Sequence, residues 1–343
     1  MSFSHLIKSS TSTVVDAIDR MADDGHDMLV VASKLSLRFD LAGALRLTAR
    51  PLRQHDVGDD GGGVRFPHDF PLDRPGTDVL LVGTCLPGRA PATTRIVSFS
   101  VGPMRKSIRV YGPRVWMKSP LGVRPGPAAS LVPTPLRFDH VFGGRDGDEY
   151  DPQNPIGRGF TRNAEGLVGK ETHRLEPADL TALAPTSGCF APIDCSWEPR
   201  RSFAGTYDAA WRENRAPIPP RDRDLRLHSD ALPEQRSPRA LSTPLVIEMS
   251  GLYGEEAVRL NLPEYKVIVT TEIEREEPLA VETSLVRILV DADARVVELL
   301  FVARRRLPRK WEALSAIRVT TPSSLPDEIK FHEGPLSSLE GGS

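Results

Sequence analysis

The side chains that could do chemistry in this chain are its three cysteines, its eight histidines and a short acidic run. Cys189 and Cys195 lie close in sequence, but no second close pair of Cys or His completes the ligand spacing of a zinc site. Asp146, Asp148 and Asp151 have the composition of a calcium loop. However, Asp151 stands where that loop needs Gly, and no Glu closes it. The sequence therefore predicts no metal site and favours a solvated acidic turn.

Nucleophilic and phosphate-binding motifs are also missing from the sequence. There is no G-x-S-x-G elbow, and Gly157-Arg158-Gly159 lacks the further glycine and the strand-to-helix frame of a dinucleotide loop. No spacing of Asp and Glu singles out an acid/base pair. We therefore expect no catalytic residue and no cofactor. The alternative, an enzyme such as an envelope-directed hydrolase with an unrecognised polar site, stays open.

Composition limits the classes of partner. The 44 basic and 46 acidic residues leave a formal charge of −2, so no global field attracts nucleic acid or an anionic membrane. An odd number of cysteines does not suggest a disulfide framework. The start lacks the pattern of a signal peptide, and no apolar run is long enough to span a bilayer. These features predict a cytoplasmic protein that binds neither nucleic acid nor membrane.

Most of the secondary-structure elements expected from the sequence, which must position any site, are strands. Met28 to Phe39 alternates apolar and polar residues, and Val79 to Gly83 is short and wholly apolar. Leu285 to Val290 and Arg295 to Val302 read as a hairpin that is apolar on two faces and therefore central in a sheet. We expect a mainly β fold: an antiparallel sandwich or barrel-like core with long irregular Pro/Gly-rich excursions and few short helices.

Proline sets the domain organisation, because 31 prolines are nearly twice the usual share and exclude helix interiors and central strands. One β-rich domain is expected over residues 12–305, with strand-rich ends at 12–118 and 245–305 and an irregular middle at 119–244. Residues 306–343 should add a short helix, from Pro308 through RKWEALSAI, and a polar tail.

The segment 138–160, FDHVFGGRDGDEYDPQNPIGRGF, is called the glycine-rich loop below. It is too rich in Gly, Pro, Asn and Asp to propagate a helix or a central strand, yet it keeps apolar anchors. Long ordered loops of this kind usually carry binding, although an Ω-like loop fastened to its own domain is equally compatible. The backbone should adopt positive φ at one or more of Gly143, Gly144, Gly157 and Gly159.

A second binding candidate lies in the irregular stretch SWEPRRSFAGTYDAAWRENRAPIPP, because Trp, Tyr and Arg are enriched in interface hot spots. The competing interpretation is that these aromatic residues anchor the stretch to the sheet. The residues expected to contact a partner, from both candidates, are Phe142, Gly143, Gly144, Asn154, Gly157, Arg158, Trp197, Tyr207, Trp211 and Arg215.

Six segments together carry a resemblance to a known family. They are GGVRFPHDFPLDRPGTDVLLVG (62–83), VGPMRKSIRVYGPRVW (101–116), PLRFDHVFGG (135–144), NPIGRGF (154–160), FAGTYDAAWRENRAPIPP (203–220) and VRILVDADARVVELLF (286–301). In this order they resemble the bacterial domain-of-unknown-function family 2169, which is found with type VI secretion systems. The resemblance covers roughly residues 12–305. This chain departs from the family pattern at RLHSD (226–230), where family members commonly have a more aromatic stretch.

The resemblance implies an adaptor or chaperone that acts in the cytoplasm of the producing bacterium and is not an enzyme. Its partners would be a PAAR-repeat protein, a toxic effector, or both, with the trimeric spike protein as a further partner. A third possibility, that the chain is itself the injected toxin, is weakened by the missing catalytic motif.

Overall fold

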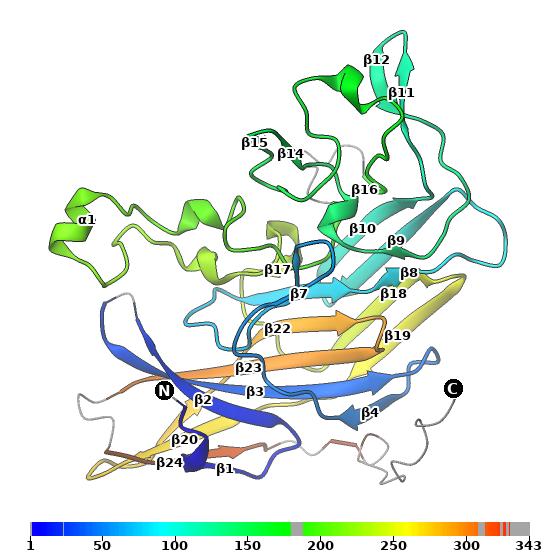
Figure 1. The fold of residues 1–343 in the computed structure, drawn as a ribbon. Coiled ribbons are helices and arrows are strands. Elements are labelled where there is room, and N and C mark those ends of the chain that lie inside the picture. The colour runs from blue at the N-terminus through cyan, green and yellow to red at the C-terminus, as the bar shows by residue number, and fades with distance from the viewer. Residues whose placement is uncertain are drawn as a thin grey trace, which may run out of the picture.

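The computed structural model describes residues 2–22, 24–179, 188–307, 313–322, 325–326 and 329. Three sheets form the body of the protein, and an irregular region lies on one side of them (Figure 1). The fold is mainly β and sandwich-like, as the strand patterns predicted. Within the described residues none of the three sheets closes on itself.

The largest sheet contains seven strands. Its order is β17 (Arg236–Ser237), β7 (Thr77–Val82), β22 (Ser284–Asp291), β23 (Val296–Arg306), β3 (Asp27–Phe39) and β2 (Val14–Met21), with β4 (Leu45–Thr48) also paired to β3. Only the β7–β22 pair is parallel. The β22–β23 hairpin lies in the centre of this sheet, which confirms its prediction from two apolar faces.

The two other large sheets have five and four strands. The first is fully antiparallel and runs β16 (Leu175–Pro177), β10 (Met104–Tyr111), β9 (Thr94–Val101), β18 (Leu245–Tyr253), β19 (Glu256–Leu262). The second runs β1 (Ile7–Ser9), β24 (Leu314–Thr320), β20 (Ile268–Ile273), β21 (Leu279–Glu282). Buried apolar side chains from all three sheets belong to one cluster, for example Leu35, Phe99 and Ile317.

Outside the three large sheets, the described chain forms two-stranded ribbons and single helical turns, many of them in the irregular middle. The ribbons of the described chain are β5 (Val57–Gly58) with β6 (Val64–Phe66), β8 (Thr84–Cys85) with β13 (Thr134–Pro135), β11 (Trp116–Ser119) with β12 (Gly122–Pro125), and β14 (Arg145–Asp146) with β15 (Glu149–Tyr150). The 3-10 turns are Ser4–Leu6, Phe138–His140, Ala164–Leu167, Arg201–Phe203, Leu225–His228 and Pro233–Gln235, and the α-helix is α1 (Ala209–Asn214).

The prediction of a helix from Pro308 to Ile317 is wrong for the part of this segment that the structure describes. Leu314 begins strand β24, in which Ile317 and Val319 are buried while Arg318 is exposed, and the strand pairs with both β1 and β20. Tertiary pairing therefore overrides the helical apolar spacing. Residues 308–312 lie outside the described part. Because β1 and β24 belong to the fold, the structured body extends on both sides of 12–305.

Candidate functional site

The glycine-rich loop folds around the side chain of Asn154, which is fully buried. Asn154 Nδ2 donates to the carbonyl oxygens of Phe138 at 3.0 Å and Phe142 at 2.8 Å. The backbone N–H of Gly144 in turn donates to Asn154 O at 2.8 Å. The loop is thus an ordered unit held by internal polar contacts, as an Ω-like loop is.

The loop's glycines are needed for its conformation. Gly143, Gly144 and Gly159 have φ of +140°, +114° and +114°, which confirms the expected positive φ. A Cβ on Gly144 would lie 2.5 Å from Gly157 O. Gly157 is not among the positive-φ residues, but a Cβ there would come within 2.4 Å of Asn154 Nδ2.

This arrangement separates the residues of the predicted partner surface into interior and accessible ones. Gly143, Gly144 and Asn154 are buried and build the interior of the loop, which argues against a direct contact with a partner. Phe142 is half-buried and meets the His173 ring edge-on at 5.8 Å. Arg158 is half-buried and forms an ion pair with Glu171. For Phe142, Gly157 and Arg158, partner contact stays a prediction.

Residues 199–228, called the arm below, extend away from the sheets and carry α1 at their far end (Figure 1). Asp208 caps α1, because its Oδ1 accepts the backbone N–H of Trp211 at 2.8 Å. The indole Nε1–H of Trp211 donates to Ile218 O at 2.8 Å, and Arg215 Nε donates to Pro219 O. These bonds close the tip into a compact turn.

The arm tip presents an aromatic pair to solvent. Tyr207 is 52% exposed, and its ring meets that of the half-buried Trp211 in a T-shaped contact with centroids 4.6 Å apart. The structure therefore brings Tyr207, Trp211 and Arg215 together at one tip. Two amphipathic aromatic rings and a guanidinium held on a capped helical turn are a suitable protein-contact surface.

Trp197 does not belong to that surface, and its burial argues against a direct contact with a partner. It is 5% exposed, belongs to the main apolar cluster and meets Phe138 edge-on with centroids 5.3 Å apart. Anchoring, the competing interpretation, is correct for Trp197. This residue attaches the start of the arm to the start of the glycine-rich loop.

A buried ion-pair network lies on the second face of the seven-stranded sheet. Its charged members are Lys34, Arg53, Asp69, Arg74, Asp78, Arg200, Asp230, Arg287 and Glu298. Lys34, Asp78, Arg287 and Glu298 come from four adjacent strands, and the others come from the segments that cover this face.

Asp230 is the hub of the network at the end of the arm. Its carboxylate lies 2.6 Å from Arg74, 3.3 Å from Arg200 and 3.4 Å from Arg287. Arg200, at the start of the arm, also donates to the carbonyl oxygen of Ile193. Both ends of the arm are therefore fastened to the sheet through one carboxylate.

Burial and charge act against each other on the pKa values in this network. Burial alone raises the pKa of Asp230, but Arg74, Arg200 and Arg287 hold it well below its usual range. Burial lowers the pKa of Lys34, although Asp69 at 2.8 Å and Glu298 partly oppose this. The Asp230 carboxylate therefore stays ionised and paired, and the arrangement of the network fastens segments together.

The sequence analysis missed this network, although a signal was present. Lys34, Arg287 and Glu298 interrupt strands that are otherwise strongly apolar, and all three are fully or almost fully buried. A charge inside a two-faced apolar strand is costly unless a partner charge covers it. That cost would have predicted covering segments with opposite charges.

The thiols and metal-ligand residues offer little chemistry in the described part of the chain. Burial raises the pKa of both the Cys85 and the Cys189 thiol to about 11, so neither is a thiolate at neutral pH. The Cys195 thiol, which is exposed, also has a raised pKa because of partial burial and Asp194. No group of three or more His, Cys, Asp or Glu residues within the described ranges is placed to hold a metal ion.

The fold and this site define a mainly β protein whose covering segments include an ordered loop and an aromatic-tipped arm. Residues 24–302 match the model of a bacterial family described as uncharacterized proteins conserved in bacteria (DUF2169), and the chain belongs to that family. No curated protein and no solved structure matches the chain. Each helix in the described ranges is too short or too polar to cross a bilayer.

Proposed function

We propose that this protein is a type VI secretion adaptor of the bacterial cytoplasm. It binds an effector that contains, or associates with, a PAAR repeat and helps to load this effector onto the spike. Membership of the DUF2169 family supports the proposal through the secretion-system association that the sequence resemblance implied. The adaptor itself carries out no reaction on the effector.

The observation that carries the proposal is the arm tip. Trp211 of the capped helix α1 and Tyr207, just before the N-cap, pack against each other at the tip of the arm, where Ile218 lies near Gly25 of the β2–β3 turn. Because Asp208 and the Trp211–Ile218 hydrogen bond order these rings before binding, little conformational entropy is lost when a partner covers them. Such rigid aromatic residues dominate protein-interface energies.

The test is co-purification of the adaptor with a PAAR-containing effector from the same bacterium, together with melting temperatures. Tyr207→Ala and Trp211→Ala should each weaken binding by roughly 2 kcal/mol, about 30-fold in Kd. Their melting temperatures should change little, because the tip lies outside the main core. Leu121→Ala is the matched control, since Leu121 is 95% exposed on the distant β11–β12 turn. Full effector recovery with both variants, or a collapsed melting temperature, would contradict the role of the arm.

A further inference from the structure

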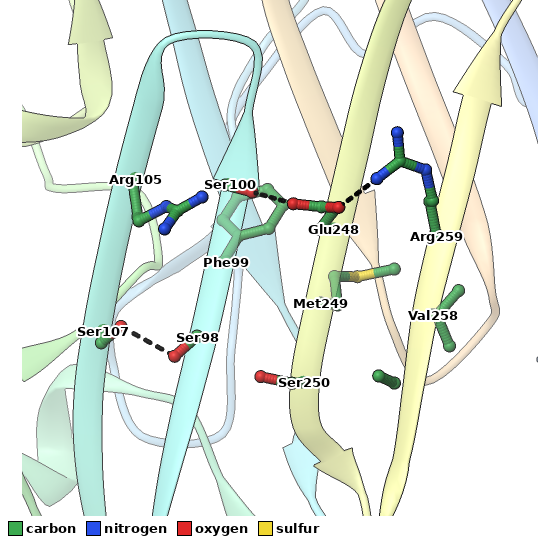
Figure 2. Close-up of a pocket in the computed structure, with 11 residues that line it drawn as sticks. Ser98, Phe99, Ser100, Arg105, Ser107, Glu248, Met249, Ser250, Val258 and Arg259 are labelled. Carbon is green, nitrogen blue, oxygen red and sulfur yellow. Dashed lines mark hydrogen bonds and ion pairs between the residues drawn. The ribbon is translucent and has the colours of Figure 1, made fainter.

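The outer face of the five-stranded sheet carries a hollow of about 400 Å³ whose floor is lined by small hydroxyl side chains. Strand register places Ser107, Ser98 and Ser250 side by side in one row across β10, β9 and β18 (Figure 2). Their neighbours along each strand, such as Phe99 and Met249, point to the buried face. Short side chains in this row leave a depression between the longer ones on either side.

A charged row forms one wall of the hollow. Arg105, Ser100, Glu248 and Arg259 are successive cross-strand partners over β10, β9, β18 and β19. Arg105, Ser100 and Glu248 are each roughly 7 Å from a serine of the other row, two residues along the same strand. The lining therefore holds two guanidinium groups against one carboxylate.

The one carboxylate, that of Glu248, already accepts hydrogen bonds from two neighbours. Glu248 Oε1 accepts from Arg259, and Glu248 Oε2 accepts from Ser100 Oγ at 3.5 Å. Arg105, by contrast, is exposed and forms no ion pair among the described residues, and Figure 2 shows its guanidinium turned toward Ser100. The uncompensated charge of the hollow is thus positive and located at Arg105.

A second guanidinium lies on β10 on the other side of the serine row, just outside the residues that line the hollow. Arg109 lies on the same face of β10, beyond Ser107, and its Nε is buried without a hydrogen-bond partner. Its cross-strand partner is Glu176, whose carboxylate accepts from Arg114 and lies 2.9 Å from His173 Nε2. Arg105 and Arg109 therefore form a basic stripe along β10, with residues roughly 14 Å apart in an extended strand.

We propose that this hollow binds an acidic segment of a partner protein, laid along β10 with its carboxylates on Arg105 and Arg109. Charge complementarity argues for this occupant, because the excess charge of the wall is positive while the whole chain carries −2. Ser98, Ser107 and Ser250 add hydroxyl groups that can donate to carboxylates or to peptide carbonyls. In an extended segment, side chains four residues apart match the spacing of the two arginines.

This binding site is separate from the arm and does not depend on the proposed function. The probe is a fluorescent peptide of alternating Glu and Thr, compared with its Gln and Thr counterpart by anisotropy at low salt. The Glu peptide should bind and the Gln peptide should not. Arg105→Ser should weaken binding about tenfold, the scale of a lost charge-assisted hydrogen bond, and Arg105→Lys should restore part of it. Ser250→Leu should block the hollow.

Arg46→Ser is the matched control, because Arg46 is an exposed arginine on β4, and it should leave peptide binding unchanged. Trp211→Ala should also leave peptide binding unchanged, so the two proposals can fail separately. Equal binding of the Glu and Gln peptides, or equal loss from Arg46→Ser and Arg105→Ser, would overturn the inference. Complete displacement of the peptide by millimolar inorganic phosphate would also overturn it, by showing a general anion site.

Discussion

At the residue scale, the glycine-rich loop shows how backbone geometry fixes amino-acid identity. Gly144 combines a φ of +114° with a carbonyl oxygen, that of Gly157, where a Cβ would have to go. Asn154 fills the centre of the loop and donates to the carbonyl oxygens of Phe138 and Phe142. The identity of these residues therefore follows from the path of the chain, with no partner needed to explain it.

We expect Gly144→Val to destabilise the protein by at least ~2 kcal/mol, because both the positive φ and the steric clash oppose a side chain. Gly147→Ala is the control in the same loop, since Gly147 also has positive φ but no atom within 4 Å of an added Cβ. It should cost only about 1 kcal/mol. Chemical denaturation of both variants measures the difference, and equal midpoints would refute this account.

At the scale of elements, the arm is positioned by an ion-pair network to which other segments of the chain contribute part of the charges. Arg200 lies at its start and Asp230 lies just beyond its end, but the further partners of Asp230, Arg74 and Arg287, come from the segment before β7 and from β22. A buried ion pair contributes little net stability, yet breaking one leaves an uncompensated charge. The network therefore serves to fix where the arm leaves the sheet.

Asp230→Asn should cost about 3–5 kcal/mol, because three buried arginines lose a shared counter-charge. It should also make residues 199–228 more sensitive to limited proteolysis than the rest of the chain. Glu213→Gln, on the exposed face of α1, is the control and should leave both properties unchanged. If Asp230→Asn unfolds the protein without earlier cleavage in the arm, the charge does not fix the arm separately from the fold.

Features set by local sequence could be predicted, whereas features set by distant partners could not. Strands such as β3 and the β22–β23 hairpin were predictable because period-two alternation and two-sided apolar runs are local patterns. The positive φ in the glycine-rich loop was predictable from the residue type. The strand at Leu314 and the identity of the partners around Asp230 were not predictable, because each depends on residues far away in the sequence. The charges inside β3, β22 and β23 signalled only that some covering charge was needed.

At the scale of the whole molecule, buried neutral histidines couple stability to pH. Burial lowers the pKa of His140 to about 4. Burial, together with the neighbouring Arg223, lowers the pKa of His228 to about 3. Both values lie below that of a free histidine, so the unfolded chain takes up protons first as the pH falls.

Stability should therefore fall as the pH is lowered from about 6.5 to about 4, by up to about 1.4 kcal/mol per pH unit for each histidine. At lower pH, protonation of paired carboxylates such as Asp230 adds to the loss. Urea denaturation at several pH values checks this. His228→Gln should flatten the dependence, whereas changing the half-exposed His26 should not. A stability that does not change with pH over this window would contradict the role of the two histidines.

The pairing of β1 with β24 has a consequence for the order in which the protein can fold. Ile7 lies opposite Ile317, and the two other large sheets likewise join strands from both ends of the chain. During synthesis, β2, β3, β7, β9 and β10 emerge long before the strands that complete their sheets. The unfinished edges of β7 and β9 must wait for β22 and β18, so this topology folds slowly and is exposed to wrong pairing while it does so.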